Sequence, residues 1–173
     1  GFTRTVAIYR PSGLGSKPPM LITLHGTGGD AKYMIQSSNA RELADQQKVI
    51  IVSPQARKMT QGDWDNHYPN DIYWETHPNT KLATNPDLQL LMAIMQEAQK
   101  AHGVDSKRIY VLGHSNGGFF AVLAAMTLQD QIAAFVSNSA GLVRCASTGS
   151  CSFTGSGTSC AALSKQSGWC CCA

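Results

Sequence analysis

The stretch from Arg108 to Gly118, RIYVLGHSNGG, decides the fold of this chain. An apolar, β-branched run ends in Gly-His-Ser-Asn-Gly at 113–117, and helix-forming residues follow directly. The pattern G-x-S-x-G between a strand and a helix is called a nucleophile elbow, and this context favours it over an ordinary Gly-Ser turn. We expect Ser115 to have strained backbone and to project its hydroxyl above the sheet edge. Glycine is expected at 113 and 117 because side chains there would strike their neighbours.

Strand and helix signals alternate on both sides of the elbow. Strands are expected at 3–10, 20–24, 49–52, 108–113 and 132–138, and helices from about 39, over 85–102 and over 115–128. This alternation predicts right-handed crossovers and an α/β fold with a mostly parallel sheet covered on both faces. Residues 1–144 form the expected core. Residues 145–173 are rich in Cys, Ser and Gly, show no regular element, and are interpreted as an excursion of the same domain.

Two of the expected helices carry capping signals. Asn39 precedes a helix in which Glu42 is the expected capping-box partner, while Leu43 and Ala44 are expected to face inward. The segment Asn85-Pro86-Asp87 combines a cap, a proline suited to the first helical position and a carboxylate suited to the positive end of the helix dipole.

Composition restricts the class of protein. A chain of 173 residues that is 43% apolar and 14% charged suits one globular domain with a buried core. The net charge of +3 is small and scattered, which argues against a nucleic-acid partner. No apolar run reaches the length of a membrane span, so no membrane partner is expected. The chain begins at Gly1, and we expect a processed or trimmed product in which a signal peptide would not be visible.

All six cysteines lie between Cys145 and Cys172. Such a cluster predicts disulfide bonds, which form in oxidising compartments, and therefore secretion to the cell exterior or the periplasm. The sequence does not choose among the pairings. A zinc site and free thiols are the alternatives, and the region contains neither a C-x-x-C pair nor a histidine to favour zinc.

The elbow predicts acyl transfer, which needs hydrogen-bond donors for the oxyanion of the tetrahedral intermediate. One donor in this arrangement is the backbone N–H of the residue after the nucleophile, here Asn116. The other comes from the loop after an early strand, here His25 to Gly29, with Thr27 as the candidate. This glycine-rich loop could instead cradle a phosphate, but no Gly-Lys-Ser/Thr follows it.

Three segments together carry a family resemblance: LHGTGGD at 24–30, Trp64-Asp65-Asn66, and YVLGHSNGG at 110–118. They resemble the α/β-hydrolases of the poly(3-hydroxybutyrate) depolymerase type and the similar feruloyl and acetylxylan esterases. The resemblance extends from about residue 3 to Gly141. It implies an α/β-hydrolase fold and a secreted serine esterase that uses Ser, Asp and His without a metal or organic cofactor. The implied substrate is a polyester or a plant cell-wall ester, and Trp64 is the implied substrate-binding residue.

Residues 57–84 form a long segment with little periodicity, which is typical of functional loops. It contains Trp64, Tyr68, Tyr73 and Trp74. These aromatic residues either line a site for an aryl ester or polyester chain, or pack the segment onto the domain, and the sequence favours neither interpretation.

The acid and the base of the triad are not apparent. In this fold both follow the serine along the chain. Asp130 is the single acid after Ser115. The five histidines, at 25, 67, 77, 102 and 114, all precede Ser115. His67 or His77 could act only if the triad order differs, as it does between other folds. We expect instead a fragment whose C-terminal strands, with the Asp and His, lie in a missing segment or a second chain. The alternative is a catalytically inactive binding or structural protein of hydrolase fold.

Overall fold

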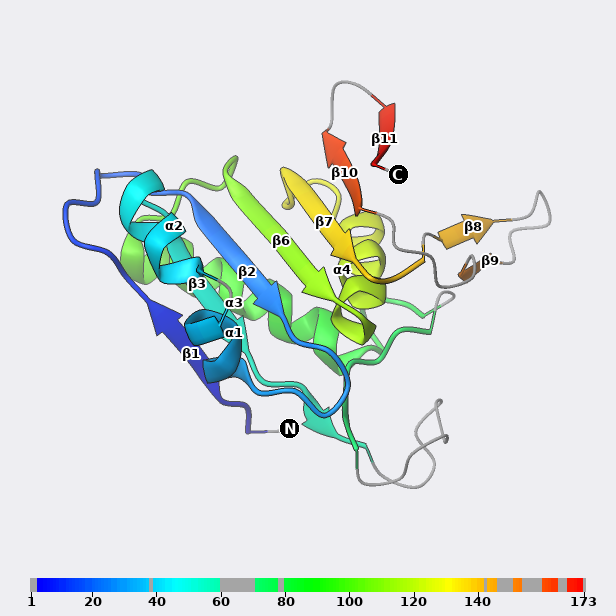
Figure 1. Ribbon diagram of the computed structural model, residues 1–173. Helices are drawn as coiled ribbons and strands as arrows, with labels where there is room; N and C mark the ends of the chain where they lie inside the picture. The colour runs from blue at the N-terminus through cyan, green and yellow to red at the C-terminus, as the bar shows by residue number, and fades with distance from the viewer. Residues whose placement is uncertain are drawn as a thin grey trace.

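The computed structural model describes residues 3–37, 39–59, 71–77 and 80–141, together with the backbone of strands at 143–145, 151–153, 160–164 and 168–172. Within these residues one seven-stranded sheet runs in the order β1 (Val6–Tyr9), β3 (Ile50–Pro54), β2 (Met20–Leu24), β6 (Ile109–His114), β7 (Ala134–Asn138), β10 (Cys160–Ser164) and β11 (Gly168–Cys172) (Figure 1). The four strands from β3 to β7 are parallel, while β1, β10 and β11 pair antiparallel at the edges. The predicted mostly parallel sheet is confirmed.

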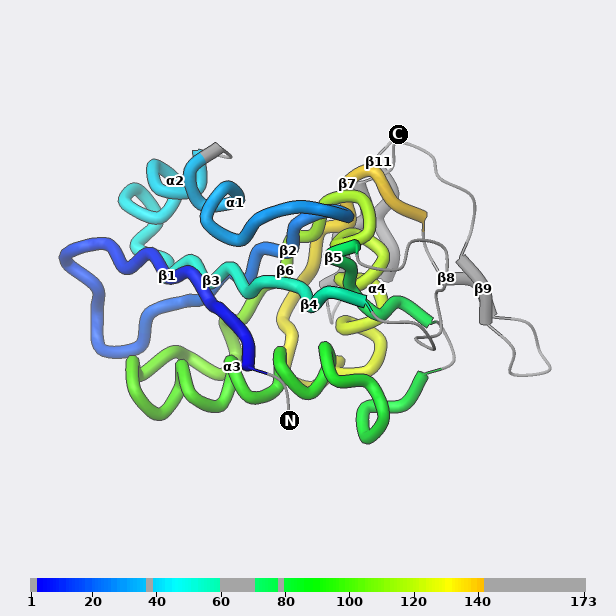
Figure 2. Tube along the Cα trace, turned by 90° about the horizontal axis from the view of Figure 1, so that it is seen from below, coloured from blue at the N-terminus to red at the C-terminus, as the bar shows by residue number. Residues whose placement is uncertain are grey.

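Helices cover both faces of this sheet, as predicted. The first two, α1 (Ala31–Ser37) and α2 (Ala40–Gln47), lie on one face, and α3 (Pro86–His102) and α4 (Asn116–Thr127) lie on the other (Figure 2). No helix in the described part of the chain is both long and apolar enough to cross a bilayer. Two short antiparallel pairs stand apart from the main sheet: β4 (Arg57–Lys58) with β5 (Ile72–Tyr73), and β8 (Val143–Cys145) with β9 (Cys151–Phe153).

The central strands are apolar on both faces because each face is covered. On β3, Ile50 and Val52 belong to the larger core cluster, which includes residues of α3 and α4. Ile51, between them, packs with Ile35 and Ala44 of α1 and α2 in a second cluster. Side chains alternate across a strand, so a strand buried on both sides reads as a continuous apolar run.

The α3 helix begins as the sequence predicts, and its first turn also contains a buried ion pair. The Asn85 side chain accepts hydrogen bonds from the N–H groups of Asp87 (2.9 Å) and Leu88 (3.0 Å). Asp87 is completely buried and forms an ion pair with Arg4, which precedes β1. A buried carboxylate needs a partner of opposite charge. Asp87 therefore has two roles: it lies at the positive end of the helix dipole, as predicted, and it joins α3 to the N-terminal segment through Arg4.

The predicted start of α2 was partly wrong. Asn39 has left-handed backbone (φ 51°), whereas a capping residue has extended backbone, and its side chain makes no capping bond. The shorter helix α1, which precedes it, was not predicted. Glu42 instead accepts a hydrogen bond from Gln46 (3.0 Å). Ala44 faces inward as predicted, but Leu43 is 43% exposed because the helix packs through its small residues.

The expectation of no regular element after Cys145 was also wrong. Strand β10 pairs with β7 through the registers Ala161↔Ser137 and Ala162↔Val136, and β11 pairs with β10. Strand pairing uses backbone groups, and the sequences of β10 (CAALS) and β11 (GWCCC) lack the alternation of apolar and polar residues that would have predicted a strand. The side chains from 142 onward lie outside the described residues, so the disulfide bonds and the division at 144/145 stay predictions.

Candidate active site

Ser115 occupies the turn between β6 and α4, with φ 53° and ψ −122°. This positive φ is rare for a residue with a side chain, so the predicted strain is confirmed. The Ser115 N–H donates to the carbonyl of Asn138 at the end of β7 (2.8 Å). Its own carbonyl accepts from the N–H groups of Gly118 (2.8 Å) and Phe119 (3.1 Å). The neighbouring strand and the first turn of the helix therefore hold the serine in this conformation.

The two glycines of the elbow are required by close backbone contacts. A Cβ atom at Gly113 would lie 1.9 Å from the carbonyl oxygen of Gly117, and one at Gly117 would lie 2.4 Å from the carbonyl oxygen of Leu24. Both obstructing atoms are backbone and cannot rotate away. The steric prediction for positions 113 and 117 is confirmed, and the second contact joins the elbow to the end of β2.

The loop after β2 packs against the nucleophile. Its turn is closed by a hydrogen bond from the Gly29 N–H to the Gly26 carbonyl (3.0 Å), and Gly28 has a φ of 69°, which the turn requires and glycine permits. A Cβ atom on Gly26 would lie 3.2 Å from the Cβ atom of Ser115, so the two segments touch. Thr27 lies exposed at the tip of this turn, directly after the point of contact.

Both predicted oxyanion donors therefore lie next to Ser115. Asn116 is the first residue of α4, and the N–H groups of a first helical turn have no partner within the helix. Thr27 is the second residue of its turn, and its N–H takes no part in the bond that closes the turn. The arrangement has the form of an oxyanion hole, and the donor roles of Thr27 and Asn116 stay predictions.

His25 positions this loop. It is 2% exposed, its Nδ1 lies 2.6 Å from the Gly26 carbonyl, and its Nε2 accepts from the Ala56 N–H (3.0 Å). Since a backbone N–H can only donate and a carbonyl can only accept, the ring is neutral with its proton on Nδ1. Burial lowers the pKa of His25 from its ordinary 6.5, against the opposing effect of the Gly26 carbonyl.

The buried His25 gives a pH dependence to stability. The unfolded chain binds a proton near pH 6.5, whereas the folded chain resists it, so the free energy of unfolding is greatest above this pH and decreases as the pH falls below it. We expect urea unfolding of the complete protein to show this decrease between about pH 7 and pH 5. A His25→Gln variant should lose the corresponding part of the slope, and a His102→Gln variant should keep it. Equal slopes in all three proteins would contradict a buried neutral His25.

The remaining histidines do not complete a triad in the described structure. His114 is exposed and lies against Gly26, and within the described part of the chain no histidine is hydrogen-bonded to the Ser115 hydroxyl. His77 is partly buried, and its carbonyl accepts from the Thr80 N–H (3.0 Å). His67 and the predicted substrate residue Trp64 lie outside the described residues.

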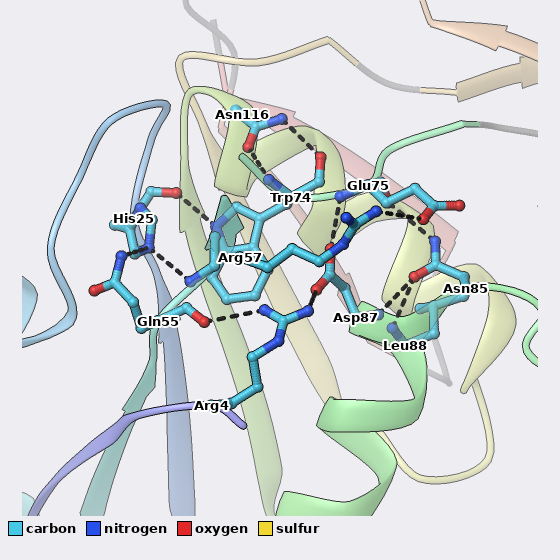
Figure 3. A network of polar contacts seen from close by, with 11 residues as sticks. Arg4, His25, Gln55, Arg57, Trp74, Glu75, Asn85, Asp87, Leu88 and Asn116 are labelled. Carbon is cyan, nitrogen blue, oxygen red and sulfur yellow. Dashed lines mark hydrogen bonds and ion pairs between the residues drawn. The ribbon is translucent and has the colours of Figure 1, made fainter. Parts of the chain in front are cut away.

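Trp74 packs the long segment onto the domain. It is completely buried and stacks on Phe120 of α4, with ring centroids 5.2 Å apart and an interplanar angle of 2°. It also joins His25 and Asn116 in one polar network (Figure 3). Packing is therefore the correct one of the two interpretations for Trp74. This network could not be predicted from local patterns, since its members are far apart along the chain.

Comparisons with known proteins show the family to which the chain is similar. The model of the family described as "Putative esterase" matches residues 1–157. A bifunctional acetylxylan esterase/xylanase, XynS20E, of Neocallimastix patriciarum is 29% identical over 135 residues, which are 78% of this chain and 18% of the relative. Poly(3-hydroxyalkanoate) depolymerase C of Paucimonas lemoignei is 25% identical over 145 residues, which are 83% of this chain and 33% of the relative.

A solved structure shows the same fold. The acetyl xylan esterase from Aspergillus awamori superimposes with a TM-score of 0.66 at 20% identity, over 87% of this chain and 53% of that chain. The α/β-hydrolase fold that the family resemblance implies is confirmed. The chain spans about half the length of this structural neighbour and a smaller share of the two relatives in sequence.

Proposed function

Because the chain belongs to the esterase family whose model matches residues 1–157, we propose that the complete protein hydrolyses carboxylic esters with Ser115 as its nucleophile. The observation that carries the proposal is the backbone of Ser115, which is held at φ 53° between β6 and α4 with the loop after β2 packed against it at Gly26. Strained backbone persists where the surrounding structure imposes it, and it is concentrated at active sites.

The proposed reaction proceeds through an acyl-enzyme. The Ser115 oxygen attacks the ester carbonyl carbon while a base takes the hydroxyl proton, and the carbonyl oxygen becomes an oxyanion. The N–H groups of Thr27 and Asn116 donate to that oxyanion. Collapse of the intermediate breaks the C–O bond, and the departing alcohol takes the proton from the base. Water then repeats the sequence on the acyl-enzyme, which releases the carboxylic acid and restores Ser115.

We place the acid and the base outside residues 1–173, on a further segment or a second chain. In this fold both follow the nucleophile, and no histidine follows Ser115 here. The proposed step needs no metal or organic cofactor. The same lack of a histidine favours a second candidate, a hydrolase-fold binding or structural protein without activity.

The names of the relatives suggest the class of substrate. One is an acetylxylan esterase and the other a poly(3-hydroxyalkanoate) depolymerase. We therefore propose a plant cell-wall ester or a polyester as the substrate, with Trp64 in contact with it, and secretion as the route to such a polymer. Disulfide bonds among Cys145–Cys172 would suit that location.

Labelling of the complete native protein with a fluorophosphonate, followed by peptide mapping, tests this function. We expect one adduct, on Ser115, because a fluorophosphonate reacts with an activated serine at the site where the tetrahedral intermediate would form. Heat-denatured protein is the control and should remain unlabelled. A native protein that takes no label would favour the inactive candidate, and an adduct on another serine would show that Ser115 is not the nucleophile. Intact mass under reducing and non-reducing conditions shows whether a second chain is attached.

A further inference from the structure

The segment Ile72–Glu75, here called the Trp74 segment, contacts both sides of the proposed oxyanion hole. We propose that Trp74 is a positioning residue. It fixes the loop after β2, here called the Thr27 loop, and the Asn116 N–H relative to each other, and its indole N–H thereby contributes to turnover without touching substrate. This inference rests on the proposed function of Ser115.

On the loop side, two hydrogen bonds come from the Trp74 segment. The Gly28 N–H donates to the Ile72 carbonyl (2.8 Å), and the Trp74 indole N–H donates to the His25 carbonyl (2.8 Å). These bonds hold the loop on either side of Thr27. The loop end of the proposed hole is therefore fixed to the Trp74 segment at two points.

On the elbow side, the Asn116 side chain binds the same segment. Its Oδ1 accepts from the Trp74 backbone N–H (2.8 Å), and its Nδ2 donates to the Trp74 carbonyl (3.3 Å). Asn116 is 4% exposed, so these bonds are shielded from water and stronger than surface bonds. The residue that offers the second oxyanion donor is thus tied through its side chain to Trp74.

The Trp74 segment is itself held from below. The Glu75 N–H donates to Asp87 (2.8 Å), and the Glu75 carbonyl accepts from the Asn85 side chain (3.0 Å) (Figure 3). The indole ring stacks on Phe120 inside the core. Anchored by α3 and α4, the segment serves as a fixed reference for the two donors.

Positioning matters at this site because the donors must meet the oxyanion and not the ground-state carbonyl. A small displacement of the Thr27 loop would weaken binding of the transition state more than binding of the ester. Ser115 itself is held separately, by the Asn138 carbonyl and by the α4 turn. Loss of the indole N–H should therefore loosen one donor and leave the nucleophile in place.

The test is a Trp74→Phe variant of the complete protein, which keeps an aromatic ring on Phe120 and loses the indole N–H. We expect kcat to fall about 10–100-fold, less than the full loss of an oxyanion donor, with KM within about twofold. Affinity for a boronic acid that mimics the tetrahedral intermediate should fall by the same factor. Affinity for an ether analogue without the carbonyl should stay unchanged.

Two further variants separate positioning from stability. Leu91→Ala removes a buried side chain of α3 and lowers stability, yet should leave kcat per fluorophosphonate-titrated site unchanged. Asn116→Ala keeps the backbone donor but removes both side-chain bonds to Trp74, so it should lower kcat and boronate affinity together, even if Trp74→Phe fails to fold. If the Trp74 and Asn116 variants that fold keep wild-type kcat and boronate affinity, the positioning role of Trp74 is overturned, while the proposed function of Ser115 stands. A wild type that takes no label at Ser115 would overturn the proposed function and this inference with it.

Discussion

A Ser115→Ala variant of the complete protein is expected to hydrolyse a p-nitrophenyl ester with kcat reduced on the order of 10⁶-fold. Without the hydroxyl no acyl-enzyme can form, and the base then has no proton to remove from the nucleophile. The oxyanion donors would remain, so a residual rate above the uncatalysed reaction is expected. Burst kinetics on the wild type and steady-state rates on both proteins measure the effect.

The variant should fold normally, because the Ser115 side chain makes no capping hydrogen bond in the structure. Its thermal unfolding should match that of the wild type within a few degrees, so lost activity cannot be assigned to lost structure. Ser139→Ala is a matched control: Ser139 also has a positive φ, of 56°, and follows the neighbouring strand β7. We expect its kcat within about threefold of the wild type. A Ser115→Ala protein with more than a tenth of wild-type activity would show that another residue is the nucleophile.

The elbow and the loop after β2 could be predicted because both are local. The strain at Ser115, the tight contacts at Gly113 and Gly117, and the position of Thr27 beside the nucleophile all follow from short motifs in their strand and helix context. The α1 helix was missed although Asp30 gave a signal: its side chain accepts from the N–H groups of Lys32 (2.8 Å) and Tyr33 (3.0 Å).

The features that escaped prediction depend on contacts between distant parts of the chain. Arg4 and Asp87 are 83 positions apart, and Trp74 and Asn116 are 42 apart. Neither pair has a characteristic sequence spacing that would predict the contact. Each residue taken alone is typical of a surface charge, a packed aromatic side chain or the start of a helix. Leu43 was misassigned for a related reason, since the packing of α2 against α1 and β3 buries Ala40 and Ala44 and leaves Leu43 exposed. The acid and the base of the triad stay predictions.

A Gly113→Ala variant is expected to lose more than about 5 kcal/mol of unfolding free energy, enough to unfold many single domains. The added Cβ would stand 1.9 Å from the Gly117 carbonyl oxygen, 2.3 Å from its carbonyl carbon and 2.7 Å from the Gly118 nitrogen. All three atoms belong to the backbone of the first turn of α4. Relief would require the helix to move away from β6, which would break the packing on which the core depends.

Gly15→Ala provides the matched control, since an added Cβ at Gly15 meets no heavy atom within 4 Å. Its unfolding free energy, measured in urea, should lie within about 0.5 kcal/mol of the wild type, because the substitution is on the surface and away from special backbone. Gly113→Ala should instead give insoluble protein or a loss of cooperative unfolding. If it folded with wild-type stability, the turn at 113–117 would be looser than the structure shows. The strained serine would then lack the contacts that impose its conformation, and Ser115 would lose the structural feature that supports it as the nucleophile.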